Sequence, residues 1–291
     1  MPIGLVTVTY SPGEHLQRFV DSLADATRSD VHVVLADNGS HDGVPEAIAA
    51  AYECVEFTPT GGNIGYGAGM NFGARILQEK RASGELHPEY FLIVNPDVVF
   101  APGSIDALIQ CARENPQAGA VGPRIVEPDG SPYPSARAVP RLSTGIGHAL
   151  LGNLWPNNPW SKAYRQDGDM EHTRQAGWLS GSCILLRWDA FLGIGGFDER
   201  YFMYLEDVDL GDRMTRAGWS NVYCPDAVIT HAQGHSTSAH SERMLRAHHE
   251  SAYRFLADRY SQPWQAPLRI LLKIGLAARA KFVTKTSAPR I

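Results

Sequence analysis

The sequence FLIVNPDVVF, residues 91–100, places a carboxylate just beyond an apolar run. Asp97 follows Asn95 and a proline at the end of a predicted buried strand. A carboxylate at the carboxyl edge of a parallel sheet can hold a divalent cation, because open α/β folds bind ligands there and hard cations prefer oxygen ligands. The alternative is that Asp97 only begins a turn, since Asp and Asn are common in turns next to proline.

A glycine-rich segment, GGNIGYGAGMNFGAR at 61–75, is the second candidate for chemistry. Gly65, Gly67 and Gly69 occupy alternate positions before a helical pattern that runs to about Lys80. The spacing is not G-x-G-x-x-G and the segment follows the third predicted strand, so a nicotinamide or flavin dehydrogenase is excluded. Glycine lets a backbone approach a ligand, and free helix amides can bind a nucleotide diphosphate. The alternative is a tight structural turn.

Alternating strands and helices must position these residues. The alternation predicts an α/β fold whose parallel sheet has helices on both faces and right-handed crossovers. After Gly130 the chain becomes rich in Pro, Gly, Asn and Trp as far as about residue 175, as functional loops or disordered segments are. Strands are expected at 3–10, 31–36, 54–58, 90–95 and 221–231, and a strand running into a helix at 177–191. Helices are expected at 13–27, 44–52, 103–115 and 241–260, and a loop leading into a helix at 201–219.

Composition narrows the class of protein. The chain has 291 residues, of which 44% are hydrophobic and 20% charged, as in ordinary globular proteins. A net charge of -5 gives no reason to expect nucleic acid as a partner. The four cysteines lie far apart without a CxxC pair, so we expect a reducing cytoplasm and no zinc knuckle. We also expect no signal peptide and no membrane-spanning helix.

Five motifs in order resemble those of the inverting family 2 glycosyltransferases of GT-A fold. They are VTVTY, LADNGSHDG, GGNIGYGAGMN, NPD and YLEDVDLGDRM, and the match covers roughly residues 3–235. Each motif is weak alone, but their order is specific, and the set looks most like bacterial rhamnosyltransferases. The resemblance implies a mainly parallel, Rossmann-like sheet in a glycosyltransferase domain at 1–260. That domain would comprise a nucleotide-sugar half (1–127) and an acceptor half (128–240), with C-terminal helices and a basic tail at 261–291.

The resemblance implies roles for residues on the donor side. Asp37 would accept a hydrogen bond from the N3–H of uracil or thymine, with Thr9 and Tyr10 beside the base or ribose. The alternatives are a turn-forming Asp and, for Tyr10, a half-buried core ring. The ribose and the donor loop would be fixed by Asn63, Gly65, Gly67, Asn71 and Asn95, although an Asn can simply cap a helix.

The same resemblance implies a Mg²⁺ or Mn²⁺ cofactor. Asp97 would supply a carboxylate oxygen, and His231, at the end of the last predicted strand, would complete the shell. The sequence departs from a full DxD motif because its first acid is replaced by Asn95, so metal affinity should be lower than at a site with two Asp. A structural or phosphate-facing histidine is the alternative for His231.

On the acceptor side the resemblance implies that Asp207 is the general base of a single in-line displacement. Glu206 and Asp209 would orient the acceptor or the base. Trp178 and Gly181, in WLSGSC at 178–183, would line the sugar and acceptor pocket. The alternatives are acids that merely suit a helix N-terminus, a surface charge at Asp209 and a buried core Trp.

The reaction implied by the resemblance is transfer of L-rhamnose from dTDP-rhamnose to a polyprenyl-diphosphate-linked N-acetylglucosamine, in cell-wall or polysaccharide assembly. Another nucleotide sugar, such as UDP-galactofuranose, is an alternative donor. A sugar nucleotidyltransferase needs a glycine- and arginine-rich loop after the first strand, which TYSPGEH does not supply. A non-catalytic binding module is disfavoured by the Glu206–Asp207 pair.

The C-terminal tail has a different charge balance from the rest of the chain. No acidic residue follows Asp258, whereas six basic residues lie in the tail from residue 261 on. We expect a basic interfacial helix on the inner face of the cell membrane, making the protein cytoplasmic and peripherally associated. The alternative is a helix docked on the core or in a homo-oligomer. The expected apolar side is Leu268, Leu271, Leu272, Phe282 and Val283, with Arg269, Lys273 and Lys281 opposite and Ile270, Ile274 and Arg279 breaking the pattern.

Overall fold

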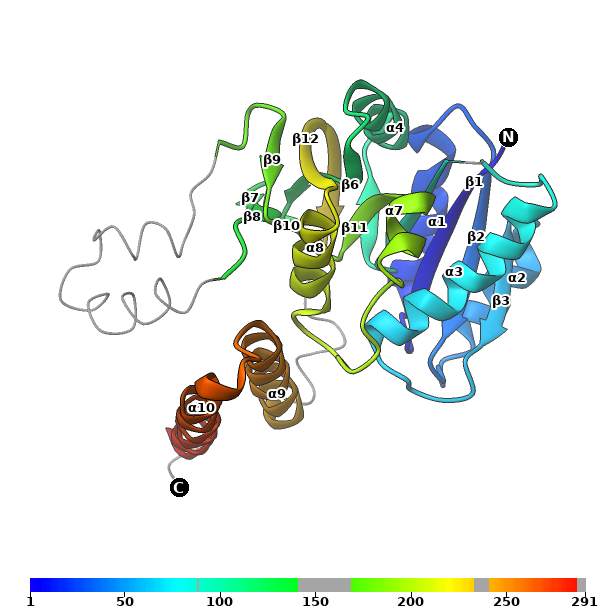
Figure 1. The fold of residues 1–291 in the computed structure, drawn as a ribbon. Coiled ribbons are helices and arrows are strands. Elements are labelled where there is room, and N and C mark those ends of the chain that lie inside the picture. The colour runs from blue at the N-terminus through cyan, green and yellow to red at the C-terminus, as the bar shows by residue number, and fades with distance from the viewer. Residues whose placement is uncertain (88, 141–168, 233–240, 287–291) are drawn as a thin grey trace.

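A computed structural model of the protein describes residues 1–87, 89–140, 169–232 and 241–286 (Figure 1). Within these ranges one ten-stranded sheet has the central order β3-β2-β1-β4-β11-β6-β12-β5. The strands of this path are β1 (Ile3–Thr9), β2 (Val31–Asp37), β3 (Val55–Pro59), β4 (Tyr90–Val94), β5 (Val98–Phe100), β6 (Ala118–Val126), β11 (Cys183–Arg187) and β12 (Ser220–His231). Short strands are β7 (Pro132–Tyr133) and β9 (Arg174–Ala176) in this sheet, and β8 (Ala136–Arg137) paired with β10 (Trp178–Leu179).

The parallel part of the sheet confirms the predicted alternation. Strands β3, β2, β1 and β4 run parallel, and the residues Thr9 and Asp37 are opposite one another at the carboxyl ends of β1 and β2. Helices connect these strands within a few residues of the expected bounds. The helices of this half are α1 (Glu14–Ala26), α2 (Val44–Ala51), α3 (Tyr66–Ala82) and α4 (Ser104–Glu114).

The remainder of the sheet is mixed, which the strand pattern did not predict. Strand β11 lies antiparallel between β4 and β6, and β12 pairs in parallel with β6 but antiparallel with β5. Strands β5 and β6 were not expected at all. Both predicted halves of the domain therefore contribute to one sheet, which is mainly but not wholly parallel, and their division stays a prediction.

Two hydrophobic cores cover the two faces of the sheet. One contains Leu16 and Phe19 of α1 with Ile105 of α4. The other contains Met70 of α3 and Trp188 of α7 (Trp188–Gly193), together with side chains of α8 (Glu206–Arg216). Alternate strand residues point into each core, as a strand period of two requires.

The C-terminal helices lie beside the body of the molecule in Figure 1. They are α9 (Ser241–Arg259), the short 3-10 helix η2 (Pro263–Gln265) and α10 (Ala266–Thr286). Arg259 of α9 lies 2.6 Å from the carboxylate of Asp212 in α8, and Phe255 is buried against the start of α8. In the described part of the chain no helix is sufficiently long and apolar to cross a membrane.

The exposed side of α10 differs from the expected one. Leu268 and Leu272 are half-buried, whereas Ile270 and Ile274, expected to break the apolar side, are exposed together with Leu271. The reason is that α10 packs against α9, so Leu268 and Leu272 are used within the fold. The structure does not describe the side chains of four further residues for which a side of the helix was expected, namely Arg279, Lys281, Phe282 and Val283.

Candidate active site

Asp97 and His231 meet at one corner of the sheet. The chain turns between β4 and β5 at Asn95–Asp97, and β5 pairs with β12 so that His231 is opposite Val98. His231 Nε2 lies 3.1 Å from Asp97 Oδ1 and 3.3 Å from Asn95 Nδ2. Burial alone would raise the pKa of Asp97, but the hydrogen bond and charge of His231 outweigh it and lower that pKa. We call Asn95, Asp97 and His231 the donor corner.

The donor corner fits a cation that a substrate helps to hold. Asn95 Oδ1 and His231 Nδ1 are buried atoms for which the described residues provide no hydrogen-bond partner. The described residues contain no group of three or more His, Cys, Asp or Glu that could hold a metal. One carboxylate and one imidazole therefore have to be supplemented by other oxygens, such as those of a diphosphate, which suits Mg²⁺ and Mn²⁺.

Glu206 and Asp207 open α8 at a second corner. The two preceding residues, Tyr204 and Leu205, have φ angles of 69° and 63°, a left-handed conformation that is unusual for side chains of this size. Asp207 accepts hydrogen bonds from the backbone amides of Gly181 at 3.0 Å and of Val208 at 2.8 Å. These two bonds hold the Asp207 carboxylate toward the turn before β11.

Both acids of this second corner have raised pKa values. Glu206 is only 7% exposed, and burial, followed by the charge of Asp207, raises its pKa to about 8. Burial also raises the pKa of Asp207, against the hydrogen bonds from Gly181 and Val208 and the charge of Arg137. Since Asp207 alone receives two amide hydrogen bonds, it loses its proton first, and Glu206 stays protonated at neutral pH. We call Glu206 and Asp207 the acceptor corner.

The turn at 180–182 connects the two corners. The amide of Asn95 donates to the carbonyl of Ser182 at 2.8 Å, and the amide of Gly181 donates to Asp207. The Tyr66 hydroxyl donates to the carbonyl of Gly181. Burial raises the pKa of Tyr66 well above its ordinary value, and the charges of Glu206, Asp207 and Asp97 raise it further. The charges of the acids of both corners thus act on one tyrosine.

The expected base-reading residues lie together at the ends of β1 and β2. Asp37 is buried, and its Oδ1 accepts hydrogen bonds from the hydroxyls of Thr9 at 2.7 Å and Ser40 at 2.5 Å. Its Oδ2 accepts from the amides of Gly39 and Ser40. Burial would raise the pKa of Asp37, but these bonds lower it. The carboxylate is an ionised brace of this loop, and its contact with a base stays a prediction; Tyr10 is 46% exposed beside it.

The glycine segment is used for close packing. A Cβ on Gly65, whose φ is +93°, would lie 2.5 Å from the carbonyl oxygen of Phe202, and one on Gly67 would lie 3.0 Å from the Cβ of Phe197. A Cβ on Gly69 would likewise lie 2.7 Å from Cγ2 of Val8 in β1. These contacts press α3 against the sheet and against the loop that leads to the acceptor corner. They favour the structural alternative for Gly65 and Gly67 over direct donor contact.

The two asparagines of the same segment also bond within the chain. Asn71 is buried, its amide nitrogen donates to the carbonyl of Phe197 at 2.9 Å, and its oxygen accepts from the Phe197 amide at 2.9 Å. Asn63 Oδ1 accepts a hydrogen bond from the amide of Gly65 at 3.2 Å. Asn71 therefore braces the 197–199 loop, and Asn63 shapes the turn before α3.

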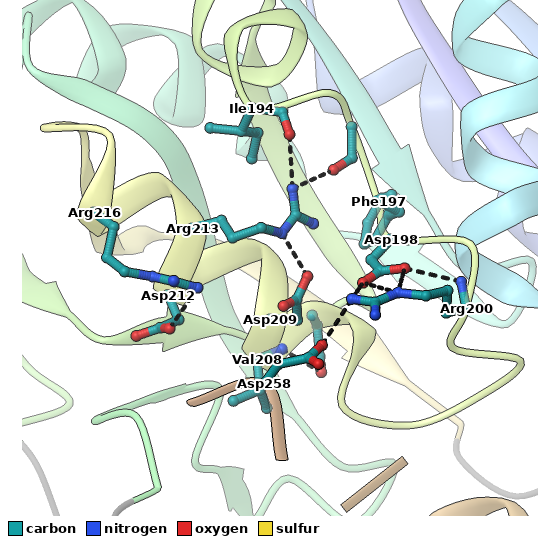
Figure 2. A network of polar contacts seen from close by, with 12 residues as sticks. Ile194, Phe197, Asp198, Arg200, Val208, Asp209, Asp212, Arg213, Arg216 and Asp258 are labelled. Atoms are coloured by element: carbon teal, nitrogen blue, oxygen red, sulfur yellow. Dashed lines mark hydrogen bonds and ion pairs between the residues drawn. The ribbon is translucent and has the colours of Figure 1, made fainter. Parts of the chain in front are cut away.

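Asp209 is directed toward Arg213 (Figure 2). It accepts a 2.6 Å hydrogen bond from Arg213 Nε, and Arg213 Nη1 donates to the carbonyls of Ile194 and Gly196 at 2.9 and 2.8 Å. Two residues along a helix correspond to a rotation of about 200°, so Asp209 and Asp207 occupy opposite sides of α8. Asp209 is neither a surface charge nor placed to bind the acceptor expected at Asp207.

Arg137 is a site residue that sequence reasoning missed. Its guanidinium lies 5.8 Å from the centre of the Trp178 ring and 5.7 Å from that of Tyr133, and its charge acts on Asp207. Trp178 is half-buried and donates through Nε1 to the carbonyl of Ala138. No local motif marks Arg137, because it reaches this position through the pairing of β8 with β10.

Comparisons with known proteins identify the family. Residues 2–249 match the model described as Glycosyltransferase like family 2. The chain is 52% identical over 290 residues to an N-acetylglucosaminyl-diphospho-decaprenol L-rhamnosyltransferase of Mycobacterium tuberculosis, covering 98% of this chain and 94% of that protein. It is 24% identical over 254 residues to Rhamnosyltransferase WbbL of Escherichia coli, covering 87% of this chain and 92% of that protein.

Solved structures show the same fold at low sequence identity. The mannosyltransferase PcManGT from Pyrobaculum calidifontis, in complex with GDP-Man and Mn²⁺, has a TM-score of 0.58 at 14% identity and covers 99% of this chain and 76% of that one. TarS of S. aureus also has a TM-score of 0.58, at 13% identity, and covers 88% of this chain and 40% of that one. These similarities establish a GT-A fold and confirm the expected fold class.

Proposed function

Because the chain belongs to glycosyltransferase family 2, we propose that it transfers L-rhamnose from dTDP-rhamnose to a polyprenyl-diphosphate-linked N-acetylglucosamine. The identity of 52% to the mycobacterial rhamnosyltransferase over nearly the whole chain supports this choice of donor and acceptor. The observation that supports the mechanism is the turn at 180–182, which is hydrogen-bonded to Asn95 of the donor corner, to Asp207 and to Tyr66. A donor diphosphate and an acceptor hydroxyl can then meet between the two corners.

The donor corner is proposed to hold the diphosphate through Mg²⁺ or Mn²⁺. Asp97 and His231 would be the protein ligands, and Asn95 would contact the ribose or a coordinated water. When bound, the cation offsets the negative charge that develops on the departing nucleoside diphosphate. The loop of Asp37, Thr9 and Tyr10 is proposed to receive the base at the neighbouring strand ends.

The acceptor corner is proposed to take the proton. The acceptor oxygen bonds to the anomeric carbon as the carbon–oxygen bond to the diphosphate breaks on the opposite face, which inverts the configuration. The hydroxyl proton passes to the Asp207 carboxylate. Two backbone amides hold that carboxylate in place, so its orientation does not have to be set during the reaction.

Two neighbouring residues are proposed to influence the charge state of Asp207, the proposed base. Glu206, protonated at neutral pH, adds no second negative charge next to Asp207. Arg137 opposes the rise of the Asp207 pKa and keeps the base ionised. Trp178, over which Arg137 lies, is proposed as a wall of the acceptor pocket, with Gly181 leaving room beside Asp207.

The acceptor determines where the enzyme is proposed to work. A polyprenyl-linked sugar is confined to a bilayer, so we propose peripheral contact with the cytoplasmic face of the cell membrane. All four cysteines are free, which is compatible with a reducing compartment. The division into a donor half (1–127), an acceptor half (128–240) and a tail (261–291) is part of the same proposal.

The test is a panel of donors with a lipid-diphosphate N-acetylglucosamine acceptor, assayed with and without EDTA. The expected result is turnover with dTDP-rhamnose that EDTA abolishes and Mn²⁺ or Mg²⁺ restores. A preference for UDP-galactofuranose would instead support the alternative donor. Turnover that is insensitive to EDTA would contradict the role of the donor corner.

A further inference from the structure

The start of α10 carries an exposed row of apolar side chains. Trp264 is 77% exposed, Leu271 67%, Ile274 61% and Ile270 59%. At 3.6 residues per turn the last three, together with Pro267, lie within about 100° of one another around the helix axis. Isolated exposed apolar residues are normal, but several on one side of a helix, with an exposed Trp in the 3-10 helix that precedes it, mark an interaction surface. We call Trp264, Ile270, Leu271 and Ile274 the α10 stripe.

The α10 stripe faces away from the packing between α9 and α10. Arg269 donates to the carbonyls of Tyr260 and Gln262 at 2.7 and 2.9 Å, and Lys273 lies 5.9 Å from the centre of the Tyr253 ring of α9. These contacts fix the rotation of α10 about its own axis. The stripe is therefore displayed by the fold and does not result from a helix left free to turn.

We propose that the α10 stripe inserts into the interface of an anionic lipid bilayer. Trp is favoured at the level of the lipid headgroups, and Leu and Ile are favoured just below it. The charge of the segment matches such a surface, because residues 261–291 include no acidic residue and six basic ones. Two copies packed through the stripe would bring their two basic segments together, which like charges oppose.

The position of the stripe links the bilayer to the acceptor corner. Helix α9 is tied to α8 by the 2.6 Å ion pair of Arg259 with Asp212, and the Ser251 hydroxyl donates to the carbonyl of Met203 at 2.8 Å, just before the acceptor corner. An inserted α10 thus has a fixed connection to the helix that begins with Glu206 and Asp207. This consequence rests on the proposed function, whereas the insertion itself does not.

Flotation of the full chain with vesicles tests the insertion. The vesicles contain phosphatidylcholine with roughly one third phosphatidylglycerol, and phosphatidylcholine alone serves for comparison. We expect binding to the anionic vesicles that weakens as salt is added. The double variant Leu271→Ser/Ile274→Ser should bind roughly a hundredfold more weakly, about tenfold for each apolar side chain removed.

Leu192→Ser is the matched control, because Leu192 is exposed on α7, outside the stripe. It should float like the unaltered chain, and circular dichroism checks that the double variant is folded. Equal flotation of the double variant and the control would overturn the proposal. A dimer in sedimentation velocity that the double substitution dissociates, without vesicle binding, would assign the stripe to a second copy and overturn it as well.

Turnover assays separate this proposal from the proposed function. The double variant should retain activity on a short-chain, water-soluble diphosphate acceptor and lose activity on a long-chain acceptor embedded in vesicles. If neither acceptor is used by the unaltered chain while flotation behaves as expected, the proposed function fails and the insertion stands. Equal loss of activity on both acceptors would contradict a role for the stripe in acceptor delivery.

Discussion

The donor corner and the acceptor corner are joined by one three-residue turn but have opposite electrostatics. The pKa of Asp97 is lowered because His231 outweighs the effect of burial, whereas burial raises the pKa values of Glu206 and Asp207. A group with a lowered pKa keeps its negative charge, as a cation ligand must. A group with a raised pKa has a greater affinity for a proton, which suits a general base. The difference assigns a separate task to each corner.

The largest expected effect comes from removing the base. Asp207→Asn keeps the size of the side chain but removes its ability to take a proton, so kcat should fall by roughly 10²- to 10⁴-fold. Steady-state transfer assays measure this. Asp226→Asn, at an exposed position in β12, is the control and should leave kcat unchanged. A fall in kcat of less than about fivefold for Asp207→Asn would contradict the role of the acceptor corner as the general base.

The second effect concerns the loop that carries the acceptor corner. Gly65→Ala places a Cβ 2.5 Å from the Phe202 carbonyl oxygen at a φ of +93°, and should lower the free energy of unfolding by about 2–4 kcal/mol. Gly84→Ala, with a φ of +82° and open space around the added Cβ, isolates the backbone strain and should cost about 1 kcal/mol. Urea titration compares the two, and equal costs would show that the Gly65 contact does not hold this loop.

Sequence reasoning predicted most helices and strands of the first half, whereas the roles assigned to the residues of both corners stay predictions. That His231 meets Asp97 was expected only from the resemblance to known glycosyltransferases, because the contact depends on the pairing of β5 with β12. The antiparallel insertion of β11 and the position of Arg137 were missed for the same reason. The donor contacts expected for Gly65 and Asn71 stay predictions, and sequence reasoning did not foresee their packing within the chain, because glycine and asparagine serve close packing and ligand binding alike. Only the facing loop at 197–202 distinguishes the two uses.

A third prediction concerns the pH dependence of stability. The pKa of Glu206 is about 8 in the folded protein, against an ordinary value of 4.5. The folded protein therefore keeps a proton that the unfolded chain releases in this range, so the free energy of unfolding falls as the pH rises from about 4.5 to 8. The slope approaches about 1.4 kcal/mol per pH unit for one proton.

Glu206→Gln should remove this contribution and flatten the pH profile of unfolding. Denaturant titrations at several pH values provide the measurement, and Glu114→Gln, at an exposed end of α4, is the control that should keep the slope. An unchanged slope in Glu206→Gln would mean that Glu206 is charged at neutral pH in the folded protein. The acceptor corner would then carry two negative charges.

The smallest expected effect is the loss of the Arg137 charge. Because Arg137 lowers the pKa of Asp207, Arg137→Gln should move the acidic limb of the pH dependence of kcat/KM to higher pH. Arg137→Lys retains the charge and should keep the limb near its original position. A structural role of the guanidinium between Trp178 and Tyr133 would instead lower activity equally at all pH values in both variants.

The most direct test of the separate tasks is calorimetric titration of dTDP in the presence of Mn²⁺ into three proteins: the unaltered chain, Asp97→Asn and Asp207→Asn. We predict that Asp97→Asn loses the Mn²⁺-dependent part of the dTDP affinity, whereas Asp207→Asn binds dTDP as the unaltered chain does. Equal weakening of dTDP binding in both variants, or full affinity in Asp97→Asn, would contradict the assignment of the two corners.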